Sequence, residues 1–108
     1  MKAEKVDSGG LPFSVLELMA DTLRVLAHAQ RLKIVEILQD EAEAPVHLIV
    51  ERTGLKQAAV SQHLNQMRRA RLLKAVRRGR EVWYAIAEPS SLTILDCIRK
   101  KYGQATGD

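Results

Sequence analysis

Apolar residues recur every three or four positions through most of the chain, and the spacing changes to two in one short part of it. The longer spacing places side chains on one face of a helix, whereas alternation is typical of a β-strand. The pattern predicts helices over residues 12–26, 30–39, 45–53, 56–70 and 89–102, and a β-hairpin with strands over residues 74–77 and 82–86.

The first predicted helix is apolar over a wide arc, because it carries two adjacent stripes. The stripes consist of Leu16, Met19, Leu23 and Leu26, and of Val15, Leu18, Thr22 and Val25. A chain of 108 residues has room for one small domain, whose core does not cover so much apolar surface. The last predicted helix also has an apolar face, formed by Ile94, Leu95, Ile98 and Tyr102. We therefore predict a homodimer through the first and last helices.

The third and fourth predicted helices are short and are joined by a turn that contains Gly54. In the fourth helix Val60, Leu64 and Met67 lie on one side and face the core. The rest of this helix is uncharged and hydrogen-bonding at its start and basic at its end, with Ala58, Gln62, Asn65, Gln66 and Arg69 outward and Gln57 and Ser61 on the flank. Two such helices, the second polar on its outer side, indicate a helix-turn-helix.

The predicted hairpin turns at Gly79, a residue type that tolerates the backbone conformations of tight turns. Trp83 and Tyr84 point to opposite faces of its second strand, so one belongs in the core and the other covers the hairpin. The predicted fold class is mainly α with a small β-hairpin, in the order of four helices, two strands and one helix. This order is that of a winged helix-turn-helix.

Charge is sorted along the chain more sharply than the net charge of +4 indicates. The window from residue 52 to residue 80 contains no Asp or Glu and nine basic residues, namely Arg52, Lys56, Arg68, Arg69, Arg71, Lys74, Arg77, Arg78 and Arg80. A solvated surface usually mixes both signs, whereas a surface that contacts phosphates excludes carboxylates. The window therefore indicates a nucleic-acid contact surface.

The ends of the chain are polar, and residues 1–11 and 104–108 are predicted to be disordered on either side of a single domain over residues 12–103. No apolar run approaches the roughly 20 residues needed to cross a bilayer. We therefore expect no membrane partner and a cytoplasmic location.

Three segments resemble ArsR-type winged-helix transcriptional repressors, and together they cover about Leu23 to Tyr84. They are residues 26–35, LAHAQRLKIV, residues 54–64, GLKQAAVSQHL, and residues 77–84, RRGREVWY. The resemblance implies a homodimer that binds double-stranded DNA at an inverted-repeat operator near its own promoter and leaves it when an effector binds.

The fourth helix is predicted to enter the major groove, which displays a distinct donor and acceptor pattern for every base pair. Gln57, Ser61 and Gln62 are expected at base edges or the groove wall, and Ala58 and Ala59 at thymine methyl groups. The predicted contacts to phosphates, or to the minor groove at the wing tip, are His63, Gln66, Arg68, Arg69, Arg77, Arg78 and Arg80. His63 has the alternative of packing beside the turn. Arg31 is expected to form a structural salt bridge rather than to contact DNA.

The metal sites of related sensors are not reproduced in this sequence. In the metalloid-sensing branch the third helix opens with two cysteines separated by one residue, and this chain has Pro45, Val46 and His47 there. The zinc-sensing branch uses Asp and His pairs in the last helix, where this chain has Asp96 and Cys97 but no histidine. His47 could still pair with Glu43 or Glu51 at helical spacing. We predict no metal and no cofactor.

Cys97 is the single cysteine, so the paired thiols of redox-sensing relatives are missing. A small buried thiol at the edge of the last helix's apolar face is the ordinary explanation. Oxidation to a sulfenic acid, or a disulfide between two subunits, is the alternative. The effector is left open, and regulation by protein concentration or by a protein partner is equally compatible with these residues.

Two other classes of function fit the sequence less well. A winged helix can serve as a protein-interaction module without DNA, but such a module does not need nine unopposed basic residues. An enzyme needs a nucleophile or an acid-base pair in a cleft, and His28, His47 and His63 lie in different segments without an evident carboxylate partner. We therefore expect no catalytic activity.

Overall fold

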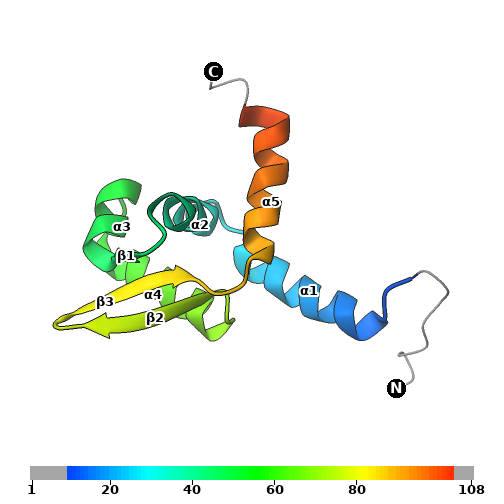
Figure 1. The fold of residues 1–108 in the computed structure, drawn as a ribbon, viewed down its shortest axis with the longest axis horizontal. Coiled ribbons are helices and arrows are strands. Elements are labelled where there is room, and N and C mark those ends of the chain that lie inside the picture. Colours follow the sequence, from blue (N-terminus) through cyan, green and yellow to red (C-terminus); the bar gives the residue numbers. More distant parts are fainter. Residues whose placement is uncertain (1–9, 104–108) are drawn as a thin grey trace.

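A computed structural model describes residues 10–103, and it contains five α-helices and three strands (Figure 1). The elements are α1 (Phe13–Leu26), α2 (Ala29–Glu41), β1 (Ala44–Pro45), α3 (Val46–Thr53), α4 (Gln57–Arg69), β2 (Leu73–Arg78), β3 (Glu81–Ile86) and α5 (Ser90–Ile98). A π-helical turn, Arg99–Gly103, continues α5. The predicted mainly helical fold with a hairpin is confirmed. Disorder was predicted for residues 1–11 and 104–108, and all of these except residues 10 and 11 lie outside the described residues.

The sheet has one strand more than the predicted hairpin. The strand order is β1-β3-β2 with antiparallel pairs, and Ala44 lies opposite Tyr84 while Pro45 lies opposite Trp83. Pro45 was predicted only as the residue that opens the third helix, and it does precede α3 as its N-cap residue. A two-residue edge strand has no periodicity to detect, and proline is tolerated at a sheet edge.

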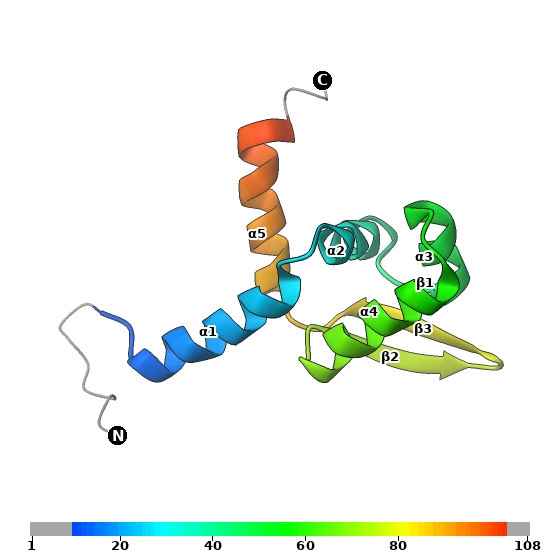
Figure 2. The ribbon, with the colours of Figure 1, turned by 180° about the vertical axis from the view of Figure 1, so that it is seen from behind.

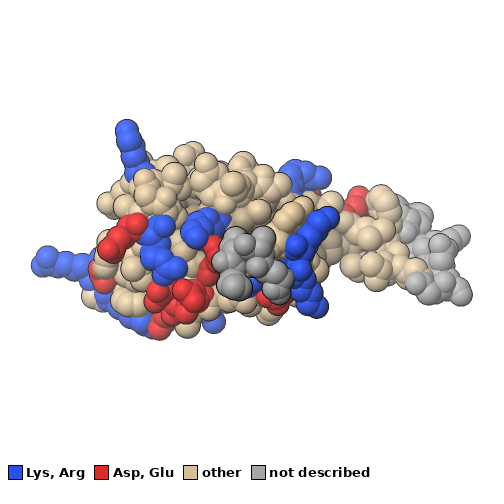
Figure 3. Space-filling model, turned by 90° about the horizontal axis from the view of Figure 1, so that it is seen from above, with Lys and Arg blue, Asp and Glu red and all other residues tan. Residues whose placement is uncertain are grey.

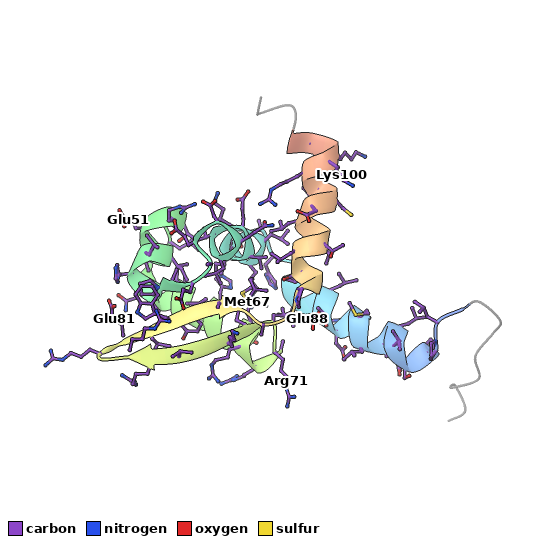
Figure 4. The ribbon with its side chains drawn as sticks, viewed as in Figure 1. Glu51, Met67, Arg71, Glu81, Glu88 and Lys100 are labelled. Carbon is purple, nitrogen blue, oxygen red and sulfur yellow. The ribbon has the colours of Figure 1, made fainter. Side chains whose placement is uncertain are left out.

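The core lies between α2, α3, α4 and the sheet. Its fully buried side chains come mainly from α2 and α4, and they include Ile34, Val35, Ile37, Leu38, Ile49, Val60, Leu64 and Met67. Met67 sits near the centre of the molecule in Figure 4. In β3, Tyr84 is buried and Trp83 is half-buried, as the alternation of that strand predicted.

Helix α1 leaves the body of the molecule as an arm, which Figures 1 and 2 show from opposite sides. Leu26 is its only buried residue, whereas Leu18 is 63% exposed and Phe13 is 52% exposed. The radius of gyration is 16.1 Å, against about 13 Å for a compact domain of this length. In α5, Leu95 is buried against the core, but Tyr102 beyond its end is 60% exposed. The apolar surface that the sequence predicted is therefore uncovered in a single chain.

Two backbone turns fix where α4 begins and ends. Gly54 has φ +75°, and its N–H donates to the carbonyl oxygen of Val50 at 2.8 Å, which ends α3 and starts the turn to α4. At the other end Arg71 has φ 65°, and the N–H of Leu72 donates to the carbonyl oxygen of Met67 at 3.0 Å. This second arrangement is a Schellman-type ending without its usual glycine. Both ends of α4 are thus set by the backbone rather than by mobile loops.

Within residues 10–103, no helix combines the length and the apolar character needed to span a bilayer.

Candidate nucleic-acid interface

The outer face of α4 carries polar side chains that have no partner within residues 10–103. Gln57, Gln62 and Gln66 are exposed, and Ser61 is half-buried beside them. Within the described residues these four side chains form no hydrogen bond to the protein. Their donors and acceptors are therefore available to an outside partner. Ala58 is exposed and Ala59 is half-buried on the same helix, so both predicted methyl contacts reach the surface.

The first turn of α4 is open to an anion. Lys56 is the N-cap residue and gives no side-chain hydrogen bond to the helix, and the first turn contains no acidic residue. The first amide groups of a helix lack intrahelical partners, and the helix dipole adds partial positive charge there. This end of α4 therefore favours a phosphate or another anion.

The tip of the wing lies close to the start of α4. Arg80, in the turn between β2 and β3, and Gln57 line the same open depression of about 310 Å³, together with His47 and Glu81. Helix α4 also packs against β2 (Figure 2). A partner that contacts the first turn of α4 would therefore also reach the wing.

Six of the nine basic residues in the acid-free window are unpaired among the residues that the structure describes. They are Lys56, Arg68, Arg69, Arg71, Lys74 and Arg80. All six are exposed, and the side chain of Arg71 points away from the body beside the end of α4 in Figure 4. The unpaired cations thus belong to α4, to the residues on either side of it and to the hairpin.

Arg52 does not belong to this set of unpaired cations, so the set begins at Lys56 and not at the start of the acid-free window. Its guanidinium forms ion pairs with Glu41 at 2.7 Å and with Asp40 at 3.3 Å. These carboxylates end α2, and distance along the chain concealed their approach to α3. Figure 3 shows blue and red atoms intermixed over this end of the molecule, whereas the α1 arm is mostly tan.

Arg78 is exposed on the wing, but it is held by its neighbours. Its Nη2 lies 2.8 Å from Glu43 Oε1, and its guanidinium carbon lies 4.9 Å from the centre of the Trp83 ring. Arg77 donates a hydrogen bond to the carbonyl oxygen of Gly79 at 3.4 Å. Arg77 and Arg78 therefore differ from Arg80, which is also expected to contact a phosphate but has no partner within residues 10–103. Arg78 would have to leave Glu43 to reach a phosphate.

His63 lies between the core face and the outer face of α4 and is half-buried. Its Nδ1 accepts a hydrogen bond from Arg31 Nε at 3.0 Å, and Arg31 Nη1 donates to the carbonyl oxygen of Val25 at 3.0 Å. The predicted salt bridge of Arg31 is wrong, because its partners are a neutral ring and a carbonyl. Burial lowers the pKa of His63, and the Arg31 charge and His28 lower it further.

His47 pairs with the wing rather than with its own helix. Its Nδ1 lies 3.1 Å from Glu81 Oε2, so Glu43 and Glu51 are not its partners. Sequence spacing indicated those two because they are near in the chain, whereas the hairpin brings Glu81 from a distance. No group of three or more His, Cys, Asp or Glu side chains within residues 10–103 is placed to hold a metal ion.

Cys97 is exposed, so the expected buried thiol is wrong for a single chain. The side of α5 that carries it does not pack on the domain. Its neighbour Asp96 lies 3.4 Å from Arg99, which also donates to Gln39 in α2 at 2.6 Å. The contact between Arg99 and Gln39 joins the end of the last helix to α2.

Comparison with known proteins supports a common origin with bacterial regulators. Residues 28–75 match the bacterial regulatory protein family arsR. The chain is 39% identical over 79 residues to the transcriptional repressor PagR of Bacillus anthracis, covering 73% of this chain and 79% of that protein. It is 30% identical over 83 residues to the transcriptional activator HlyU of Vibrio cholerae, covering 77% of this chain and 76% of that one.

Solved structures agree with the fold. The crystal structure of NolR from Sinorhizobium fredii matches with a TM-score of 0.75 and 31% identity, over 84% of this chain and 90% of that one. The crystal structure of PagR matches with a TM-score of 0.73 and 37% identity, over 80% of this chain and 98% of that one.

Proposed function

Because this chain belongs to the arsR family of bacterial regulatory proteins and is a DNA-binding transcriptional regulator, we propose that it acts as a homodimeric repressor on an inverted-repeat operator. The observation that carries the proposal is the outer face of α4, which is exposed, unpaired and uncharged at its start and basic at its end. Each subunit would place α4 in one major groove.

We assign the residues of this interface by their positions on α4 and the wing and by their hydrogen-bonding groups. Gln57, Ser61 and Gln62 contact base edges or the groove wall, and Ala58 and Ala59 approach thymine methyl groups. Gln66, Arg68 and Arg69 contact phosphates from the end of α4, and Arg77 and Arg80 do so from the wing. Arg78 contacts a phosphate only when its ion pair with Glu43 opens. The proposal implies a cytoplasmic location, where the operator lies.

The homodimer rests on the uncovered arm. Burying a Leu or Phe side chain fully stabilises a structure by about 1.5–3 kcal/mol. Helix α1 exposes several such side chains together, and Ile98 and Tyr102 near the end of α5 add to them. A second copy of the chain covers this surface and also spaces two α4 helices for two half-sites of the operator.

Repression, rather than activation, is the direction supported by PagR, which is named a repressor and is more similar to this chain than the activator HlyU. A dimer bound over a promoter excludes the polymerase without needing any further surface. We propose no metal effector. The exposed Cys97 stays the candidate for a redox response.

A gel-shift assay with the DNA upstream of the chain's own gene tests the proposal. Gln62→Ala should weaken binding to the operator and leave random duplex unchanged, because Gln62 contacts a base. Arg80→Ala should weaken both duplexes about equally, because it contacts a phosphate. Equal effects of both substitutions on both duplexes would show that α4 is not the recognition helix.

A salt titration separates this proposal from a protein-interaction module. Binding through about six to ten phosphates should weaken by roughly 10³ to 10⁵ between 50 and 200 mM salt. Repeating the assay with divalent metals, oxidant and reductant, on wild type and Cys97→Ser, then identifies the sensing mode. A response to oxidant that disappears in Cys97→Ser would assign redox sensing to this thiol.

A further inference from the structure

Arg31 connects three helices at one point. It lies in α2, its Nη1 donates to the carbonyl oxygen of Val25 in the last turn of α1, and its Nε donates to His63 Nδ1 in α4. Both distances are 3.0 Å, and both groups are partly buried. One side chain thus joins the end of the exposed arm to the middle of the helix that carries the DNA-contacting face.

The contact with Arg31 decides the chemical form of His63. A guanidinium can only donate hydrogen bonds, so the nitrogen that it faces must act as an acceptor. A histidine whose Nδ1 accepts is neutral and carries its single proton on Nε2. Protonating Nδ1 would break this hydrogen bond and place a second positive charge beside Arg31. Desolvation of the ring favours the same neutral form and lowers the pKa of His63.

The Nε2–H group of His63 is free and reaches the surface. The contacts of His63 in the described part of the chain are the hydrogen bond at Nδ1 and the neighbouring His28 ring, whose centre lies 6.2 Å away. No buried side-chain nitrogen or oxygen of residues 10–103 lacks a hydrogen-bond partner, so Nε2 is accessible to solvent. At helical spacing His63 follows Ala59 and precedes Gln66 on the flank of the outer face.

We infer that Arg31 is a positioning residue for DNA binding: it holds His63 in the tautomer that directs Nε2–H outward, so that a neutral ring in the middle of α4 donates a hydrogen bond to a phosphate of the operator. The inference rests on the proposed function and adds to it a role for a residue outside the α4 and wing surface. Because the same guanidinium binds the last turn of α1, it also fixes this donor relative to the dimerisation arm.

The first test examines the free protein and needs no DNA. Long-range ¹⁵N–¹H NMR spectra distinguish a histidine protonated at Nε2 from one protonated at Nδ1. We expect Nε2–H alone for His63 in wild type and a mixture of both tautomers in Arg31→Met. A wild-type His63 that is protonated at Nδ1, or a tautomer that does not change in Arg31→Met, would overturn the inference.

The second test compares two replacements of His63, one that keeps the donor near Nε2 and one that keeps the acceptor near Nδ1. His63→Gln keeps a donor near the position of Nε2 and loses the acceptor for Arg31. His63→Asn keeps an acceptor near Nδ1 and loses the outward donor. Because a hydrogen bond to a charged group contributes more than a neutral one, we expect His63→Asn to weaken operator binding at least about tenfold and His63→Gln to weaken it less. The reverse order would refute the outward donor.

A double-mutant cycle then isolates the effect of Arg31. Arg31→Met should weaken operator binding in the wild-type background, but much less in the His63→Gln background, where no tautomer has to be selected. If Arg31 instead contacts DNA itself, the loss is the same in both backgrounds and the salt dependence of binding also falls. Thermal unfolding of each variant checks that the fold is intact.

Failure of the inference is distinguishable from failure of the proposed function. If wild type binds no duplex, both the proposed function and the DNA part of the inference are refuted, and the NMR result alone still decides whether Arg31 sets the tautomer. Suppose instead that wild type and His63→Asn bind the operator equally, while Gln62→Ala no longer prefers the operator over random duplex. The proposed function is then supported and the role of His63 is refuted.

Discussion

Helices α1 and α4 have the same kind of amphipathic pattern, but the molecule treats them differently. In α4 the predicted apolar face is complete, because Val60, Leu64 and Met67 are fully buried. In α1 only Leu26 of the two predicted stripes is buried, and Leu18 and Leu23 stand in solvent. Helix α4 therefore exposes mainly polar side chains, whereas α1 also exposes apolar side chains that a core would normally bury.

The difference shows what each exposed face is suited to bind. A helix whose apolar side is already packed gains little from another protein, and its free amides and hydroxyls suit a polar surface such as a DNA groove. A helix whose apolar side is bare gains most from a second apolar surface. The comparison thus assigns DNA to α4 and a second subunit to α1.

Placing charge on the arm should have the largest effect on function. Leu18→Glu with Leu23→Glu puts two carboxylates where the partner helix would pack, and burying an unpaired charge is strongly unfavourable. We expect monomers of 12.1 kDa by analytical ultracentrifugation. Operator affinity should fall by about 10² to 10⁴, because binding two half-sites with one linked dimer is lost.

Arg24→Glu is the matched control for this experiment. It changes the charge of the same helix by the same amount, but Arg24 lies on the polar side, where its ion pair with Asp21 is highly exposed and contributes little. Dimers that survive the double substitution, or that dissociate equally in Arg24→Glu, would break the distinction between the two helices.

Truncating the packed face of α4 should act on the fold instead. Leu64→Ala removes a fully buried side chain, and such changes cost about 2–5 kcal/mol of unfolding free energy. Asn65→Ala, on the exposed side of the same turn, should stay within about 0.5 kcal/mol of wild type. Urea unfolding at one fixed protein concentration measures both. A small cost for Leu64→Ala would mean that α4 is not packed as the structure has it.

The wing allows a second comparison, because one of its two arginines near the tip is held by other side chains and the other is not. Arg80 is unpaired, so Arg80→Ala should lower the slope of log affinity against log salt by about 0.9 for each phosphate that it no longer neutralises. Arg78→Ala should lower this slope less, because Arg78 is already paired with Glu43 and lies over Trp83.

Glu43→Gln should release Arg78 and tighten binding to random duplex. Weaker binding by Glu43→Gln would show that the ion pair orders the wing for DNA.

Most of the fold followed from spacing within the sequence, since each helix carries its own period and Gly54 and Gly79 mark the turns. The missed features all depend on approach between distant segments. Strand β1 exists because Ala44 meets Tyr84, and neither residue indicates the other in the sequence. The neutralisation of Arg52 by α2 and the capture of Arg78 by Glu43 were hidden for the same reason.

The candidate site was predictable to a similar degree. The outer face of α4 follows from helical projection, and the residues assigned to it are exposed, except that Ala59 and Ser61 on its flank are half-buried. The link between Arg31 and His63 was not predictable, because these residues lie 32 positions apart and meet only when α2 packs across α4. A signal was present, since an arginine beside apolar helix positions needs a partner, but the sequence did not name that partner.

The smallest effect is a dependence of stability on pH that comes from this link. His63 has a lowered pKa in the folded chain, chiefly because the ring is desolvated and secondly because Arg31 is close, so below the ordinary value of 6.5 the unfolded chain binds more protons than the folded one. Stability contributed by neutral His63 is therefore complete above about pH 6.5 and is lost as the pH falls through the folded pKa. Between about pH 7.5 and pH 5.5 wild type should lose more unfolding free energy than His63→Gln, measured by urea midpoints at each pH. If both proteins show the same pH dependence, the ring is not desolvated against Arg31, and α4 is then coupled to the arm only through its apolar packing.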